Sequence, residues 1–335
     1  MRIEQSKIKN IGIIRGSAIG DIIAYTPILR NLRKIFPKGR ICLITGNLAG
    51  TKFLSNCSYI DEIISINPKS SLREKFLFFK KLISLHLDMI IDAHPVKNTL
   101  MLCLLSMAKY RVTFRNSKFS KYYNVKSSEY FTSNDVVLEN LKILNPLNDK
   151  NIKFETNLEI FLDFKSKNVI NNLNNLLKVS NIKKNEKVIV IHIGGMERSI
   201  EKGRNHRCWL NENWVELCRK ILKKYDLKII FIGGQDNLAD SSKIIEEISH
   251  KNVINLVTKL SLQESTALIK KCCLFICTDS GPMHIAVTLR KRVIALLSKL
   301  TWKIDAYITD PIRKEDVLKI NVDEVFRKVE SVLKK

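Results

Sequence analysis

The stretch from Leu274 to Arg290 constrains the fold most, because it predicts a strand, a tight polar turn and a helix start in direct succession. Apolar and β-prone residues lead into Thr278-Asp-Ser-Gly-Pro282, and apolar positions then recur at helical spacing. Pro282 suits the first helical turn, since its missing N–H would have no partner there, and Asp279 or Ser280 can cap the free amides. Such a helix start admits a phosphate through its N–H donors and its dipole. The turn alone predicts either an ordinary capped junction or a phosphate site.

Length and charge narrow the classes of protein that fit. The 335 residues suffice for two domains, and 45% hydrophobic with 27% charged residues is typical of a globular protein. The net charge of +24 predicts attraction to a polyanion, which could be nucleic acid, an anionic membrane surface or an acidic acceptor. The window from Ala93 to Ser128 holds seven Lys and Arg residues and no acidic residue. We expect either an anion-binding region or an ordinary lysine-rich surface there.

The eight cysteines and the apolar runs indicate the compartment. No Cys-x-x-Cys pair or zinc-ligand spacing occurs, which favours buried, reduced thiols. The first residues lack the apolar core of a signal peptide, and the longest uncharged run, Asn98 to Ala108, is too short to span a bilayer. Leu72 to Leu87 predicts an amphipathic helix with a basic face, which we expect to pack on the core rather than on a membrane. We therefore expect a cytoplasmic protein, at most peripheral to the membrane.

Alternating strand and helix patterns predict two α/β halves. Residues 11–15 predict a strand, 16–21 a glycine-bearing turn, and the next residues a helix that begins near Pro27 or is kinked there. The turn matches neither the P-loop nor the dinucleotide fingerprint, which argues against a nicotinamide dehydrogenase. Asp21 is then either a plain helix cap or a group that faces a ligand. A second series of such units follows a linker near residues 160–168, which gives domains 1–163 and 164–335.

Six short motifs, in order along the chain, together resemble glycosyltransferase family 9, which includes the ADP-heptose:lipopolysaccharide heptosyltransferases. Asp279-Ser-Gly-Pro-Met-His284 resembles the signature loop of the family, and Gly20-Asp21 resembles its amino-terminal signature. Counterparts of the other family motifs lie between them: Gly194-Gly195, Arg207-x-Trp209, Gly233-Gly-x-Asp236 and Ser261-Leu-x-Glu264. The resemblance implies an α/β fold of two Rossmann-like domains facing a cleft, the glycosyltransferase-B architecture, in which the last helix (322–335) commonly crosses back to the first domain.

The resemblance also implies roles for individual residues. In the first domain, Asp21 would be the general base that takes the proton of the acceptor hydroxyl. Further residues of that domain would meet the anionic acceptor: Gly20, Asp92, His94, Arg111 and Arg115. In the second domain, three kinds of group would hold the diphosphate. They are the amides at a helix start, glycines that let the backbone come close, and a cation where the family usually has a lysine. These donor-site residues are Gly194, Gly195, Arg207, Gly233, Asp236, Asp279, Ser280, Gly281, Pro282, Met283 and His284.

The predicted function is inverting transfer of a sugar, with heptose from ADP-heptose favoured, to a hydroxyl of the lipopolysaccharide inner core. The predicted partners are that nucleotide sugar and an anionic glycolipid acceptor, with an anionic membrane surface as a further candidate and no nucleic acid. Neither a metal nor a cofactor is implied, and no Asp-x-Asp triplet occurs. Asn237 stands where the family often has an acid that meets the ribose, which leaves the donor open. The alternatives are a nucleotide-sugar epimerase of the same architecture and a non-catalytic polyanion-binding protein.

Overall fold

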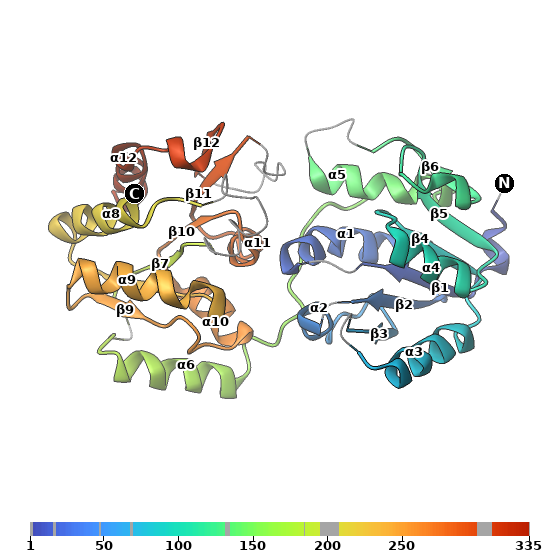
Figure 1. Cartoon of the computed structure of the whole chain (residues 1–335), viewed down its shortest axis with the longest axis horizontal. Helices are drawn as coiled ribbons and strands as arrows, with labels where there is room; N and C mark the ends of the chain where they lie inside the picture. The colour runs from blue at the N-terminus through green and yellow to red at the C-terminus, as the bar shows by residue number, and fades with distance from the viewer. Residues whose placement is uncertain are drawn as a thin grey trace. The chain divides into compact units, whose positions relative to one another are not determined.

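The computed structural model describes residues 3–15, 18–46, 48–67, 70–130, 135–183, 185–194, 208–299 and 310–334. The chain divides into two compact units, which we call unit 1 (Met1–Leu162) and unit 2 (Asp163–Lys335) (Figure 1). This division lies one residue before the predicted boundary. Each unit is an α/β fold built on a six-stranded parallel sheet, of the Rossmann-like kind that the sequence predicts.

The sheet of unit 1 has the strand order β3-β2-β1-β4-β5-β6, and all its pairings are parallel. Its strands are β1 (Asn10–Ile14), β2 (Arg40–Thr45), β3 (Glu62–Ser65), β4 (Met89–Asp92), β5 (Tyr110–Phe114) and β6 (Val125–Ser127). Its α-helices are α1 (Ile19–Ile35), α2 (Leu48–Phe53), α3 (Leu72–Ser84), α4 (Lys97–Leu105) and α5 (Val136–Leu141). The order reverses between β1 and β4, and ligands of doubly wound sheets bind at the carboxyl ends of the strands that flank such a switch.

The sheet of unit 2 repeats this topology, with the order β12-β11-β10-β7-β8-β9 and parallel pairings throughout. Its strands are β7 (Val188–His192), β8 (Lys228–Phe231), β9 (Val253–Asn255), β10 (Leu274–Thr278), β11 (Val293–Ser298) and β12 (Asp310–Lys314). Its α-helices are α6 (Lys167–Val179), α8 (Asn211–Lys224), α9 (Leu238–Ile248), α10 (Leu262–Lys271), α11 (Gly281–Thr288) and α12 (Val322–Leu333). The switch point of this sheet lies between β7 and β10.

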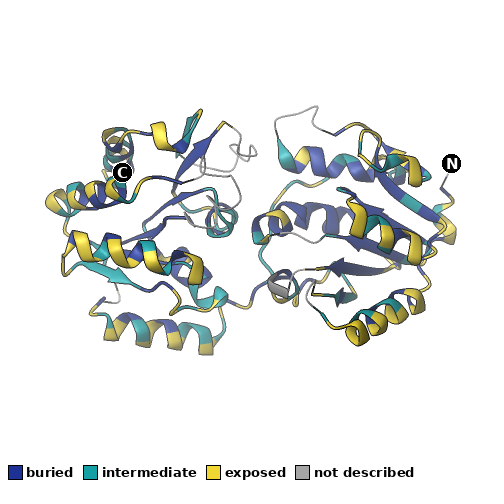
Figure 2. Ribbon diagram, in the orientation of Figure 1, coloured by how far each residue is buried: buried dark blue, intermediate teal, exposed yellow. Residues whose placement is uncertain are grey.

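The apolar strands explain why each sheet is covered on both faces. Ile11, Ile13, Ile41 and Ile276 are fully buried, as expected for parallel strands between two helical layers. Figure 2 shows the strands mostly in the colour of buried residues and the outward sides of the helices in that of exposed ones. The hydrophobic runs of the sequence therefore supply both cores.

The predicted capping box at the start of α10 is confirmed. The Ser261 hydroxyl accepts a hydrogen bond from the Glu264 amide at 3.2 Å, and the Glu264 carboxylate accepts one from the Ser261 amide at 2.7 Å. This exchange satisfies two amides that a helix start would otherwise leave without partners.

Helix α12 packs within unit 2. Its valines 322, 325, 329 and 332 belong to the core of that unit, and Lys220 of α8 lies 2.5 Å from the Asp323 carboxylate. Trp209, just before α8, is also buried, and its indole N–H donates to the Ile320 carbonyl at 2.9 Å. The apolar side of α12 is therefore used within unit 2, and its return to the first domain, which the resemblance implies, stays a prediction.

Helix α3 packs on the core with one side and exposes apolar residues on the other. Phe78 and Leu82 are buried, as expected for a helix that packs on the core, but Leu72 and Phe76 are 85% and 67% exposed. The helix has apolar residues on two sides, and only one of them can face the sheet. The expectation that α3 packs on the core is confirmed, and its solvent side carries apolar residues in addition to the expected basic ones.

The described cysteines are all free thiols, and each is buried except Cys273, which is half-buried. Burial raises the pKa of the Cys42 thiol to about 12 and that of Cys57 to about 11, so both thiols stay protonated and unreactive near neutral pH. Within the part of the chain that the structure describes, no helix is long and apolar enough to cross a membrane.

Candidate active site

The carboxyl end of β1 leads into α1, whose first turn carries Asp21. Ala18 precedes the helix and makes no side-chain cap, so Asp21 lies inside the first turn and the plain-cap interpretation is wrong. The Asp21 side chain is 49% exposed, and its Oδ1 lies 3.3 Å from the guanidinium of Arg15. Arg15 directly follows β1, is 12% exposed, and lies over the ring of Tyr25 at 5.0 Å. An accessible carboxylate is thus held beside a largely buried cation at the switch point of unit 1.

One of our sequence expectations was that this helix begins near Pro27. Helix α1 instead begins at Ile19 and continues through Pro27. A proline has no N–H to donate to the carbonyl four residues earlier, which belongs to Ile23. The Thr26 hydroxyl donates to that carbonyl instead, at 2.8 Å. This substitute hydrogen bond explains how a proline is accommodated in the helix that carries Asp21.

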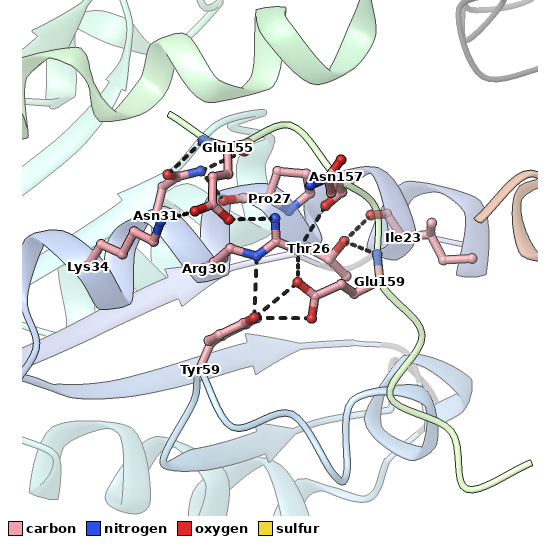
Figure 3. Close-up of polar contacts among 10 residues, drawn as sticks. All are labelled: Ile23, Thr26, Pro27, Arg30, Asn31, Lys34, Tyr59, Glu155, Asn157 and Glu159. Atoms are coloured by element: carbon pink, nitrogen blue, oxygen red, sulfur yellow. Dashed lines mark hydrogen bonds and ion pairs between the residues drawn. The ribbon is translucent and has the colours of Figure 1, made fainter. Parts of the chain in front are cut away.

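The extended segment 155–159 fastens α1 to the end of unit 1 (Figure 3). Asn31 donates to the Glu155 carbonyl at 2.8 Å and accepts from its amide at 3.1 Å. Thr26 accepts from the Glu159 amide at 3.1 Å, and the buried Arg30 forms ion pairs with both glutamates. Since these contacts fix α1 along its length, they also fix the position of Asp21 at its start.

Asp92 ends β4, the strand on the other side of the switch. Its carboxylate is buried and accepts hydrogen bonds from the Tyr123 hydroxyl at 2.8 Å and from the His94 amide at 3.2 Å. Burial raises the pKa of this carboxyl, and the hydrogen bonds from Thr99, Tyr123 and His94 act against that rise. Asp92 thus shapes the turn after β4, and its carboxylate faces neighbours inside unit 1.

His94 follows Asp92 and lies in an aromatic pocket. Its ring meets that of Tyr130 edge to face at 4.9 Å, and the ring of Phe114 lies 6.4 Å away. Burial lowers the pKa of His94 to about 4, and the positive charge of Arg15 adds to this effect while the negative charge of Asp21 opposes it. His94 is therefore neutral at neutral pH and lies within the electrostatic reach of the Arg15–Asp21 pair.

The two predicted acceptor arginines lie at opposite ends of β5. Arg111 is near the amino end, where its guanidinium donates to the carbonyls of Ala108 and Tyr122 at 3.1 and 3.2 Å. Arg115 follows the carboxyl end and is exposed. Arg115 therefore lies at the carboxyl edge of the unit 1 sheet, whereas Arg111 lies at the amino edge. The other predicted acceptor-site residues at the carboxyl edge are Gly20, Asp92 and His94, beside Asp21.

Arg15 is the residue of this site that our sequence interpretation did not single out. Its signal was a lone cation at the end of an apolar strand, directly before the glycine-bearing turn. Such a position places a charge at the sheet edge where ligands of doubly wound folds bind.

In unit 2, α11 begins directly after β10, as the opening motif predicts. Ser280 is the extended N-cap residue, but its hydroxyl donates to the Thr278 carbonyl at 3.2 Å and does not cap the helix. Pro282 lies in the first turn, Met283 is buried, and Gly281 and His284 are half-buried. The signature motif therefore forms a helix start at the switch point, with no side chain of the N-cap residue over its amides.

The turn after β7 is built around Gly194, whose φ of 77° lies in the left-handed region that favours glycine. Its amide donates to His192 Nδ1 at 3.2 Å, and its carbonyl accepts from the Asn237 amide group. Asn237 also accepts from the Gly234 amide at 3.1 Å, and a side chain at Gly233 would collide with it. Asn237, which replaces the acid common in the family, thus ties the turns after β7 and β8 together.

The remaining donor-site candidates divide into two groups. Asp236 is exposed in the turn after β8. Burial lowers the pKa of His192 to about 4, and the negative charge of Asp236 acts against this lowering. With Gly194, Gly233 and the 279–284 motif, Asp236 lies at the carboxyl edge of the unit 2 sheet. Gly195 and Arg207 lie outside the described residues.

No group of three or more His, Cys, Asp or Glu side chains that could hold a metal ion occurs among the residues that the structure describes.

A family model and a sequence relative indicate the same family. A family model described as "Glycosyltransferase family 9 (heptosyltransferase)" matches residues 76–308. Lipopolysaccharide heptosyltransferase 1 of Campylobacter coli is 26% identical over 325 residues, which cover 90% of this chain and 87% of the relative.

Solved structures share the fold of the whole chain. A family 9 glycosyltransferase from Veillonella parvula has a TM-score of 0.81 at 17% identity and covers 99% of both chains. The E. coli heptosyltransferase WaaC with ADP-2-deoxy-2-fluoro heptose has a TM-score of 0.71 at 14% identity, covering 96% of this chain and 99% of that one. A UDP-GlcNAc 2-epimerase from Methanocaldococcus jannaschii has a TM-score of 0.60 at 16% identity, covering 97% of this chain and 93% of that one.

Proposed function

Since the chain belongs to glycosyltransferase family 9 (heptosyltransferase), we propose that it moves heptose from ADP-heptose to a hydroxyl of the lipopolysaccharide inner core, with inversion at the anomeric carbon. The observation that carries this proposal is the accessible Asp21 carboxylate beside Arg15 at the switch point of unit 1. A glycosyl transfer needs a base for the acceptor hydroxyl, and this pair supplies one in a fixed position.

On the acceptor side, Asp21 takes the proton of the attacking hydroxyl. The hydroxyl oxygen forms a bond to the anomeric carbon while the bond from that carbon to the diphosphate oxygen breaks. Neutral His94 can exchange a hydrogen bond with a sugar hydroxyl, and exposed Arg115 can meet an anionic group of the acceptor. Gly20 leaves the space beside Asp21 free of a side chain.

On the donor side, the departing diphosphate binds at the start of α11. The amides of Ser280 and Gly281 and the helix dipole supply partial positive charge, and Gly194 allows the backbone to come close. Arg207 adds a full charge in the same role. These groups stabilise the negative charge that grows on the leaving diphosphate, and the proposed reaction uses neither a metal nor a cofactor.

The partners in this proposal are a nucleotide sugar and an anionic glycolipid, and we place the reaction at the cytoplasmic face of the membrane. The similar E. coli enzyme WaaC with its ADP-heptose analogue supports the choice of donor. The net charge of +24 supports an anionic acceptor.

Incubation of the purified protein with ADP-heptose and a truncated core acceptor tests the proposal. We expect equal amounts of heptosylated acceptor and ADP, detected by mass spectrometry. Conversion of the sugar nucleotide without acceptor would support an epimerase instead. Salt-sensitive binding to duplex nucleic acid that ignores sugar nucleotides would support a polyanion-binding protein.

A further inference from the structure

Large apolar side chains are exposed mainly in one region of unit 1. Nine of the fourteen exposed large hydrophobic residues in the described part of the chain lie between residues 72 and 107. They come from α3, α4 and the residues next to α4, and we call this region the α3–α4 surface. Its apolar members are Leu72, Phe76, Leu77, Ile83, Val96, Met101, Leu104, Leu105 and Met107.

The two helices form one continuous layer. Phe78 and Leu82 of α3 share a buried cluster with Cys103 of α4 and with strand residues of the same sheet. Because these residues point inward, the opposite sides of both helices point to solvent, as their colouring in Figure 2 shows. The exposed apolar residues therefore belong to one outer face and are not scattered single side chains.

The same face is basic. On α3, Arg73 and Lys80 are exposed among the apolar residues, and Lys97 is exposed at the start of α4. Glu74 is an exposed acid of α3, but its carboxylate accepts hydrogen bonds from the Ser71 amide and hydroxyl at 2.7 and 2.8 Å. Exposed cations thus lie among the exposed apolar side chains of α3, and Lys97 adds one at the start of α4.

The α3–α4 surface also adjoins the site edge of unit 1. Helix α4 begins only three residues after His94, so Val96 and Lys97 lie at the carboxyl edge of the sheet. An object that docks on this surface would lie next to the groups that we assign to the acceptor.

We propose that the α3–α4 surface docks on an anionic lipid bilayer. Side chains such as Phe76 and Leu104 would enter the interfacial region, while Arg73, Lys80 and Lys97 would meet anionic headgroups. A bilayer can satisfy both the apolar and the basic side chains of this surface, and it would hold the glycolipid acceptor beside Asp21. The inference rests on the proposed function only for that last point, since bilayer binding requires no catalysis.

Co-sedimentation of the full chain with phosphatidylcholine vesicles, with and without phosphatidylglycerol, tests the proposal. We expect binding that requires the anionic lipid. The double variant Arg73→Gln/Lys80→Gln should bind roughly 30-fold more weakly, at about fivefold for each lost charge. The double variant Phe76→Ser/Leu104→Ser should lose at least about tenfold, because less apolar area enters the bilayer.

A matched control changes an exposed apolar residue and its basic neighbour elsewhere. Lys178→Gln/Val179→Ser, on α6 of unit 2, should bind vesicles as the parent does; Val179 is 81% exposed. Unchanged circular dichroism and melting temperature would show that each variant is folded.

Three results would overturn the inference. They are a parent that does not bind anionic vesicles, α3–α4 surface variants that bind them as tightly as the parent, and an α6 control that loses as much affinity as those variants. A dimer in light scattering that the Phe76→Ser/Leu104→Ser variant converts to a monomer would identify a second copy as the occupant instead. Vesicle binding without any heptosyl transfer would contradict the proposed function and leave the docking surface intact.

Discussion

The two sheets have the same strand order, but their switch points differ in chemistry. The edge of unit 1 presents ionisable side chains: Arg15, Asp21, Asp92 and His94. The edge of unit 2 has a left-handed glycine after β7 and a helix start after β10, beside the side chains of Asp236, Asp279 and His284. A site of the first kind can move a proton, whereas one of the second kind can hold an anion. In the proposed reaction, one topology would supply both the proton-accepting group and the anion site, according to which residues follow the strands.

The largest expected effect on turnover comes from replacing Asp21, the proposed base at the edge of unit 1. Asp21→Asn should lower kcat by roughly 10²–10⁴-fold, the range typical of a lost general base, because the amide cannot take the proton. The measurement is steady-state transfer with saturating donor. Asp61→Asn is a matched control, since Asp61 is 46% exposed and pairs with Arg33 at 2.6 Å in the same unit. Near-normal turnover in Asp21→Asn would remove Asp21 from the chemistry.

Each switch point also holds a neutral histidine, half-buried His94 in unit 1 and buried His192 in unit 2, which predicts a common response to acid. The folded pKa values of His94 and His192 are about 4, below the value of about 6.5 expected in the unfolded chain. The unfolded state therefore binds more protons between these values, and stability falls as pH falls through this window.

Between pH 7 and pH 5, each of the two histidines should lower the free energy of unfolding by on the order of 2 kcal/mol. Urea unfolding at the two pH values measures this change. His192→Gln should reduce the pH dependence, whereas replacement of the exposed His250 should not. A pH dependence that is the same in His192→Gln and the parent would contradict the assigned burial effect.

The Arg15–Asp21 contact can be tested by a double-mutant cycle. Arg15→Met should lower kcat by roughly tenfold, within the usual range of coupling for residues in contact, because the carboxylate loses its fixed partner. Arg15→Lys should restore part of the rate. If Arg15 acts through Asp21, Arg15→Met should have little further effect on kcat in the Asp21→Asn background. Additive losses would show that the two residues act independently.

The smallest expected effect separates the two arginines of β5. Arg115→Ala should raise the KM for the acceptor a few-fold, about the effect of one exposed charge, and leave kcat unchanged. Arg111→Ala should leave that KM unchanged, because its guanidinium binds backbone carbonyls at the other edge of the sheet. Parallel KM measurements on both variants decide this point, and an equal rise in both would restore Arg111 as an acceptor residue.

The sequence allowed the alternation of strands and helices and the turns after residues 11–15 and 274–278 to be predicted, because apolar runs and turn residues are local signals. It could not show that Arg15 pairs with Asp21, since the contact depends on how the turn between them brings the two together. It also could not separate Arg111 from Arg115, which required the exact ends of β5. For α3, the pattern predicted an amphipathic helix with a basic face, and only the packing shows that Leu72 and Phe76 lie on its exposed side.

Calorimetric titration with ADP tests the assignment of donor and acceptor to the two units most directly, because it needs no acceptor. Ser280→Pro and Arg207→Ala should each weaken ADP binding by roughly 10–100-fold, the loss expected for one hydrogen bond or ion contact to a charged group. In Ser280→Pro the ring removes an amide donor and cannot adopt the φ of −157° at this position. Asp21→Asn and Arg115→Ala should bind ADP as the parent does. Parent-like ADP binding in both unit 2 variants, with a loss in Asp21→Asn or Arg115→Ala, would contradict the account.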